Sequence, residues 1–104
     1  MTQKTKLGIP ELLSSHQKAQ ILAIAEKHGA ENVRVFGSIA RGEATPNSDL
    51  DLLVDYNRAK RSAWFPIGLK LDLEQLLHRP VDIATVSMLK ERMRDRVLAE
   101  AVKL

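Results

Sequence analysis

The segment that most constrains this chain is a seven-residue stretch at 49–55, DLDLLVD, in which acidic and apolar residues alternate. A period of two is typical of a β-strand with one buried face. On such a strand Leu50, Leu52 and Val54 share one face, and Asp49, Asp51, Leu53 and Asp55 share the other. The preceding residues 42–48, GEATPNS, have the composition of a loop. The pattern therefore predicts a strand that buries aliphatic side chains on one face and gathers carboxylates on the other.

Helical spacing of apolar residues marks three longer segments. The first lies between residues 10 and 29, with Ser14 or Ser15 as its N-cap and Gly29 where a helix usually stops. The second spans 67–78 and ends before a proline. Ser87 is expected to cap the third, whose apolar stripe is Leu89, Met93, Val97, Ala101 and Leu104. These patterns predict helices that each bury one face.

Two more segments read as short strands, at 33–36 and 81–86. A brief helical stretch is expected from Gly37 to Arg41, and residues 56–66 are irregular and basic, with Arg58, Lys60 and Arg61 in a cluster. Helices that alternate with three short strands indicate an α/β chain in which a single sheet is backed by helices. We predict one domain over residues 1–104.

The amino-acid composition excludes several classes of site and of protein. The 104 residues include no cysteine, which excludes a disulfide framework, a Cys-ligated metal and a thiol nucleophile. No run approaches the roughly 20 apolar residues of a membrane span, and no signal-peptide pattern is seen near the start, so we expect a cytoplasmic protein. The net charge of +3 permits nucleic-acid binding, but basic residues are interleaved with acidic ones and aromatic residues are few, so nucleic acid is not favoured.

One motif resembles a known family. Gly37-Ser38, ten further residues and then Asp49-x-Asp51 is the pattern of the DNA polymerase β-like nucleotidyltransferases, and GSIARGEATPNSDLDLLVD is similar to their smallest members, the minimal nucleotidyltransferases. GAENVRVF before the motif, and LEQLLHRPVDIATV and RDRVLAEAV after it, extend the resemblance from about Ile9 to the C-terminus. It implies a mixed α/β fold of α+β type, with a short sheet of three or more strands and about four helices. The loop at 56–66 departs from the family.

The chemistry that the resemblance implies suits these residues. Nucleotidyl transfer develops negative charge on phosphate oxygens, which two Mg²⁺ ions held by carboxylates can stabilise. Asp49 and Asp51 would point the same way about 7 Å apart along a strand. Asp82, on a neighbouring strand, would be the third metal ligand and catalytic carboxylate. Asp55 lies at the far end of its strand and is interpreted as a surface or capping residue.

The nucleotide would meet the turn at the start of the motif. Gly37 lets the backbone approach a phosphate, and Ser38 can hold the β- and γ-phosphates through its hydroxyl and amide at a helix N-terminus. Arg41, one turn later, can hold the triphosphate or pair with Glu43, and the sequence does not separate these alternatives.

We therefore expect an Mg²⁺-dependent nucleotidyltransferase that moves AMP from ATP to an acceptor. The resemblance implies a protein acceptor, a tyrosine hydroxyl of a HEPN-domain ribonuclease toxin encoded nearby, with this chain as the antitoxin. Two alternatives stay open: a non-catalytic module that masks the toxin by binding, and a small-molecule adenylyltransferase. The sequence also permits a homo-oligomer.

Three minor features receive ordinary interpretations. His16, His28 and His78 have no metal-like spacing and are expected at the surface or at helix ends. Trp64 and Phe65 are interpreted as loop anchors that pack on the core. The basic side of the last helix is interpreted as a solvated face.

Overall fold

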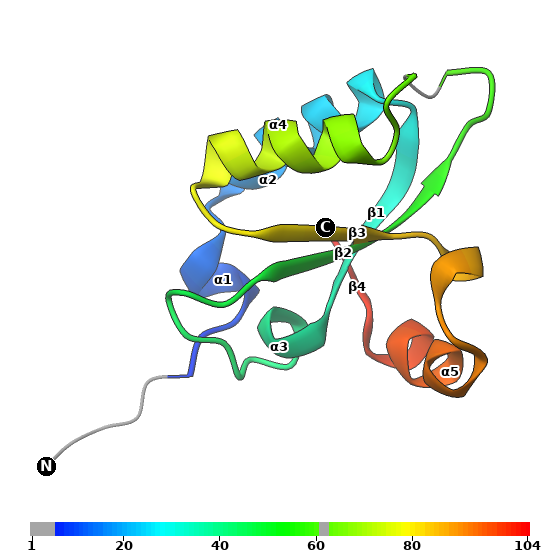
Figure 1. Cartoon of the computed structure of the whole chain (residues 1–104). Helices are drawn as coiled ribbons and strands as arrows, with labels where there is room; N and C mark the ends of the chain where they lie inside the picture. Colours follow the sequence, from blue (N-terminus) through cyan, green and yellow to red (C-terminus); the bar gives the residue numbers. More distant parts are fainter. Residues whose placement is uncertain (1–5, 61–62) are drawn as a thin grey trace, which may run out of the picture.

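A four-stranded mixed sheet forms the centre of the computed structural model, which describes residues 6–60 and 63–104 (Figure 1). The spatial order of the strands is β3-β2-β1-β4. Strand β2 runs antiparallel to β1 and parallel to β3, and β4 is antiparallel to β1. The strands are β1 (Ala30–Phe36), β2 (Leu50–Tyr56), β3 (Val81–Ala84) and β4 (Val102–Lys103). The predicted α/β fold with a mixed sheet is confirmed.

Helices cover both faces of this sheet. In Figure 1, α2 and α4 lie on one side of it, and α3 and α5 lie on the other. The helices are α1 (Ile9–Leu12), α2 (Ser15–Lys27), α3 (Gly37–Ala40), α4 (Ile67–Leu77) and α5 (Glu91–Glu100), with a 3-10 turn, η1 (Val86–Met88). Within the described residues, no helix is long and apolar enough to cross a membrane.

The alternation at 49–55 forms strand β2 as predicted, beginning at Leu50. Leu50, Leu52 and Val54 are fully buried and belong to the main core cluster with residues of α2 and α4, such as Ile21 and Leu73. Leu53 is also fully buried but lies outside that cluster, because it points to the opposite face of the sheet. Both faces of β2 therefore carry apolar side chains where helices cover them.

The first predicted helix is confirmed as α2, with Ser14 as its N-cap, and a separate short helix that the sequence did not predict, α1, precedes it. Ser14 accepts a hydrogen bond from the Gln17 amide at 3.0 Å, and Gln17 Oε1 accepts one from the Ser14 amide at 3.0 Å. This reciprocal capping box begins a new helix and leaves Leu13 extended. Gly29, with φ of 79°, follows the end of α2 as predicted.

The C-terminal predictions need a larger correction. Ser87 does not cap a helix, because it lies in η1 and its hydroxyl is 3.1 Å from Thr85 Oγ1; Lys90 is the N-cap of α5. Strand β3 also ends at Ala84, two residues early. The helix stops at Glu100, and the next residues pair with the free edge of β1. This pairing gives hydrogen-bond partners to backbone N–H and C=O groups at the edge of β1. The periodicity of apolar residues in the sequence does not reveal this stabilisation.

Of the two loop anchors predicted before α4, Phe65 is confirmed and Trp64 is wrong. Trp64 is 75% exposed, so it is not a core anchor. Phe65 instead packs on Tyr56, with the two ring centroids 5.3 Å apart, and is partly buried against the core. Arg61, part of the basic cluster, lies outside the described residues.

Candidate active site

Three strand ends meet at the edge where the predicted motif lies. Strand β1 ends there at Phe36, and β2 and β3 begin there. The register pairs Phe36 with Asp51 across β1 and β2, and Asp51 with Asp82 across β2 and β3. Asp51 is therefore the central carboxylate, with Gly37 on one side and Asp82 on the other.

Gly37 brings the backbone against Asp51. Its φ of 77° lies in the left-handed region, and a Cβ placed on it would overlap Oδ2 of Asp51. The turn into α3 at this point therefore needs a residue without a side chain. Ser38 follows immediately in α3, and both residues line the same hollow as Asp49 and Asp51.

The environment of Asp51 makes its ionised form costly. Burial, then repulsion from Asp82 and a hydrogen bond between the two carboxyls, then repulsion from Asp49, raise the pKa of Asp51 to about 6. Arg41 opposes this shift weakly, as the last of the causes. A half-buried carboxyl with acidic neighbours and a raised pKa is typical of a functional site.

These carboxylates fit a divalent cation by their chemistry. They supply hard oxygen donors whose mutual repulsion a bound cation would relieve. As the side chains stand, no three His, Asp or Glu residues in the described ranges form a ready metal site. Asp82 is exposed, and its Oδ1 lies 3.8 Å from the Lys70 ammonium, which donates a 2.6 Å hydrogen bond to the Val81 carbonyl.

A hollow of about 390 Å³ holds the remaining predicted residues. Its lining comes from the end of β1, α3, the start of β2 and one face of α5. The residues are Phe36, Gly37, Ser38, Arg41, Ser48, Asp49, Asp51, Met93, Arg96, Val97 and Glu100. A larger hollow of about 540 Å³, lined by residues such as Leu22, Glu26 and Lys103, contains none of the predicted site residues. The smaller hollow is the better candidate for the active site because the predicted carboxylates and the Gly37-Ser38 turn line it.

Arg41 is held by two carboxylates. Its Nε donates to Glu43 Oε1 at 2.8 Å, and its Nη1 donates to the two oxygens of Glu100 at 3.1 and 3.3 Å. These hydrogen bonds raise the pKa of Arg41, the bond with Glu43 having the largest effect. Pairing with Glu43, one of the two alternatives for Arg41, is thus the arrangement that the structure shows.

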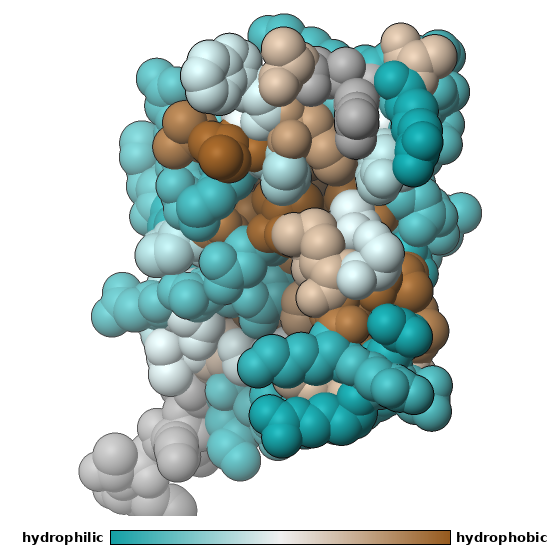
Figure 2. Space-filling view, turned by 45° about the vertical axis from the view of Figure 1, so that its right-hand side comes forward, coloured by the Kyte–Doolittle hydropathy of each residue, from teal (hydrophilic) through white to brown (hydrophobic). Residues whose placement is uncertain are grey.

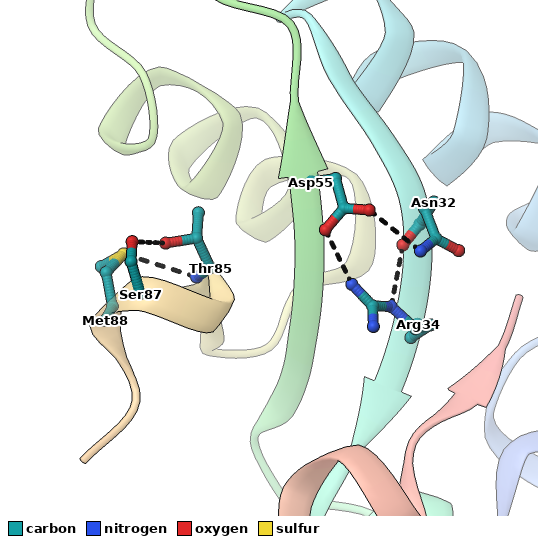
Figure 3. A network of polar contacts seen from close by, with 6 residues as sticks. All are labelled: Asn32, Arg34, Asp55, Thr85, Ser87 and Met88. Carbon is teal, nitrogen blue, oxygen red and sulfur yellow. Dashed lines mark hydrogen bonds and ion pairs between the residues drawn. The ribbon is translucent and has the colours of Figure 1, made fainter. Parts of the chain in front are cut away.

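Asp55 lies at the other end of β2, as predicted. Figure 3 shows that it faces Arg34 and Asn32 on β1, whose side chains donate hydrogen bonds to it, each at 3.0 Å. Thr85, Ser87 and Met88 form a separate set of contacts around η1 in the same view. Asp55 therefore has a structural role in this arrangement, away from Asp51.

Comparison with known proteins agrees with this geometry. A profile described as the nucleotidyltransferase domain matches residues 18–104. The chain belongs to the nucleotidyltransferase domain family. The enzyme is 37% identical to the protein adenylyltransferase MntA of Thermococcus cleftensis over 102 residues, covering 98% of each chain.

Two solved structures resemble the nucleotidyltransferase. One, named as a proposed minimal nucleotidyltransferase, is 42% identical, has a TM-score of 0.77 and aligns with 97% of this chain and 100% of its own. The other is a toxin–antitoxin structure with AMP-PNP, which is 20% identical with a TM-score of 0.64 over 83% of this chain and 70% of its own. The second likeness shows the shared fold.

Sequence reasoning missed what α5 contributes to this nucleotidyltransferase. Met93, Arg96, Val97 and Glu100 all line the hollow, at a spacing that puts them on one face of a helix. Met93 and Val97 belong to the predicted apolar stripe, so the stripe already indicated which face of the last helix packs on the protein. Glu100 also accepts a hydrogen bond from the Gly37 amide at 2.7 Å, which joins the end of α5 to the start of α3.

His28 is the other residue that the sequence undervalued. It ends α2, as predicted for a helix-end residue, but it is only 8% exposed. Its Nε2 lies 2.7 Å from Asp72 Oδ2 on α4, and this hydrogen bond is the main cause that lowers the pKa of Asp72. The pair links the two helices that cover one face of the sheet.

Proposed function

We propose that the enzyme transfers AMP from Mg²⁺-bound ATP to a hydroxyl of a protein acceptor. The observation that carries this proposal is the meeting of Gly37 and Ser38 with Asp49, Asp51 and Asp82 at one edge of the sheet. Such a juxtaposition of a phosphate-binding turn with carboxylates is what nucleotidyl transfer requires. We place the reaction in the cytoplasm, where ATP is available.

In this proposal Asp49, Asp51 and Asp82 hold the magnesium. The metal would supply charge stabilisation to the phosphate oxygens at the reacting centre. Ser38 would bind the distal phosphates through its hydroxyl and its amide. A direct contact between Arg41 and the triphosphate requires that Arg41 leave Glu43 or Glu100, which hold it in the structure.

The reaction balances as a displacement at phosphorus. The acceptor oxygen forms a bond to the α-phosphorus, and the bond from that phosphorus to the bridging oxygen of the β-phosphate breaks. Pyrophosphate leaves with the electron pair. The hydroxyl proton passes to a carboxylate, and we assign this role to Asp82, which is exposed and adjacent to Asp51.

The proposed acceptor is a tyrosine of a HEPN-type toxin, with this enzyme as its antitoxin. Two likenesses support a protein acceptor: the relative named as a protein adenylyltransferase, and the fold neighbour solved as a toxin–antitoxin structure with AMP-PNP. The site itself also lies open at the sheet edge, because Asp49 and Asp82 are exposed. An open site suits an acceptor that another protein presents.

The test is transfer of label from α-labelled ATP to the proposed HEPN-type toxin. The wild-type enzyme with Mg²⁺ should raise the mass of that partner by one or more AMP units, and Asp51→Asn should not. An exposed Asp95→Asn on α5 is the matched control, because it makes the same change outside the hollow. An unmodified partner after incubation with folded wild-type enzyme, ATP and Mg²⁺ would refute the proposal.

A second candidate, masking of the partner by contact alone, is favoured by one observation. Trp64, Ile67 and Leu71 are large apolar side chains that remain exposed along α4 and the turn before it. Figure 2 shows one face of the molecule, on which apolar side chains emerge among hydrophilic ones. Full growth rescue by Asp51→Asn on co-expression with the toxin, without modification of the toxin, would establish masking instead.

A further inference from the structure

The two cations that line the hollow differ in what they already bind. Arg41 has its guanidinium shared between Glu43 and Glu100, and Glu100 is only 16% exposed at its side chain. The charge of Arg41 is therefore balanced before any ligand enters. Glu100 also holds the Gly37 amide, so the two contacts together fix the turn rather than leave a free cation.

Arg96 is in the opposite situation. It lies on the face of α5 that lines the hollow, four residues before Glu100, where helical neighbours meet. Even so, within residues 6–60 and 63–104 it makes no hydrogen bond or ion pair, with Glu100 or with any other group. Arg96 thus lines the same hollow as Gly37 and Ser38 without an anionic partner in the described residues.

The negative charge of the hollow is a second reason to expect an unpaired cation at the nucleotide. Asp49, Asp51 and Glu100 line it, and each of these carboxylates repels a triphosphate. Metal at the aspartates would offset part of this repulsion, but the phosphates nearest Ser38 need a cation on the α5 side. Arginine suits this task, because its planar fork of donors matches phosphate oxygens in a bidentate contact.

We propose that Arg96, and not Arg41, is the residue that binds the β- and γ-phosphates of the nucleotide substrate. This inference rests on the proposed function, since it assigns a residue to the same nucleotide site. Arg41 then acts as a positioning residue, which together with Glu100 holds the Gly37 turn in place. The basic side of α5 is accordingly part of the substrate site at this position.

The test compares nucleotide binding to Arg96→Ala, Arg96→Lys and Arg92→Ala. Arg92 is a matched control, because it is exposed on the same helix and does not line the hollow. Calorimetry would use Mg²⁺ with an ATP analogue whose α–β bridge cannot be cleaved, and AMP as the second probe. Melting temperatures of all variants would verify that they fold.

Arg96→Ala should weaken binding of the ATP analogue by about tenfold or more, as expected when a charge-assisted hydrogen bond is lost. It should leave AMP binding within about twofold of the wild type, because AMP lacks the phosphates concerned. Arg96→Lys should fall between wild type and Arg96→Ala, since lysine keeps the charge without the fork. Arg92→Ala should match the wild type for both probes.

Two outcomes would overturn the assignment. One is an Arg96→Ala variant that binds the ATP analogue as the wild type does, and the other is an equal loss for ATP analogue and AMP. In either case, wild-type transfer to the partner would leave the proposed function intact. If the wild type itself binds no nucleotide, the proposed function fails together with this inference.

Discussion

Replacing Asp51 by asparagine should stabilise the metal-free enzyme at neutral pH. Burial of the Asp51 carboxyl, and after it the facing Asp82 and the nearby Asp49, raise the pKa of Asp51 from an ordinary 3.8 to about 6. In the folded state the charge is therefore costly, whereas in the unfolded chain it is solvated. Asparagine keeps the shape of the side chain and removes the charge, so both the cost of burying that charge and its repulsion are lost.

The magnitude follows from the shift in pKa. A difference of about two units corresponds to about 3 kcal/mol, at about 1.4 kcal/mol per unit. Because the carboxyl is partly exposed to solvent, which screens its charge, we expect about 1–2 kcal/mol. For a domain of about 100 residues this raises the melting temperature by roughly 5–10 °C.

The sign of the pH dependence gives a second check. Between pH 3.8 and about 6 the folded wild type binds more protons than the unfolded chain, so its stability from this group falls as the pH rises. The advantage of Asp51→Asn should thus be complete above about pH 6 and vanish near pH 4. Other carboxylates that titrate in acid, such as Glu74 with its lowered pKa, change the unfolding free energy of the wild type and of Asp51→Asn equally. Their effect therefore cancels in the difference between the two proteins.

The assay is urea unfolding followed by circular dichroism, in EDTA, at several pH values between 4 and 7.5. Asp95→Asn is the control for a simple change of net charge, because Asp95 is exposed and has no ion pair within the described residues. If Asp51→Asn is less stable than the wild type at pH 7.5, Asp51 is structural. If the gain is the same at pH 4, the charge of Asp51 is not its cause.

Four further expectations follow from the site. Gly37→Ala should cost more stability than Gly42→Ala in urea unfolding and should abolish transfer, because both positions have positive φ but only Gly37 would overlap Asp51; equal costs would refute the close approach. Mg²⁺ should bind weakly alone in calorimetry and much more tightly with ATP, and triphosphate binding that ignores the metal would count against a metal site. Asp82→Asn should fold normally yet give no labelled partner, and retained labelling would move its role to another carboxylate. Trp64→Ala should change the unfolding free energy by less than about 0.5 kcal/mol, since this side chain is exposed, but should weaken capture of the partner; a fully retained partner would exclude Trp64 from the interface.

Local patterns in the sequence determined most of the sheet and the turn at Gly37. The alternation at 49–55 predicted β2 and its two faces, because a period of two depends only on neighbouring residues. The same local reasoning found the turn at Gly37 and the end of α2 at Gly29. The motif from Gly37 to Asp51 also identified the family, which the profile match at 18–104 confirms.

Tertiary structure alone decided how the turn is held and which face of α5 reaches it. Glu100 and Gly37 are 63 residues apart, so no local period could indicate their hydrogen bond. The contact of Arg41 with Glu100 was settled in the same way, whereas Glu43 lies two residues from Arg41 and was already an alternative in the sequence. Likewise the chain after Glu100 leaves the helix because the edge of β1 offers backbone partners, a gain that exists only once the sheet has formed.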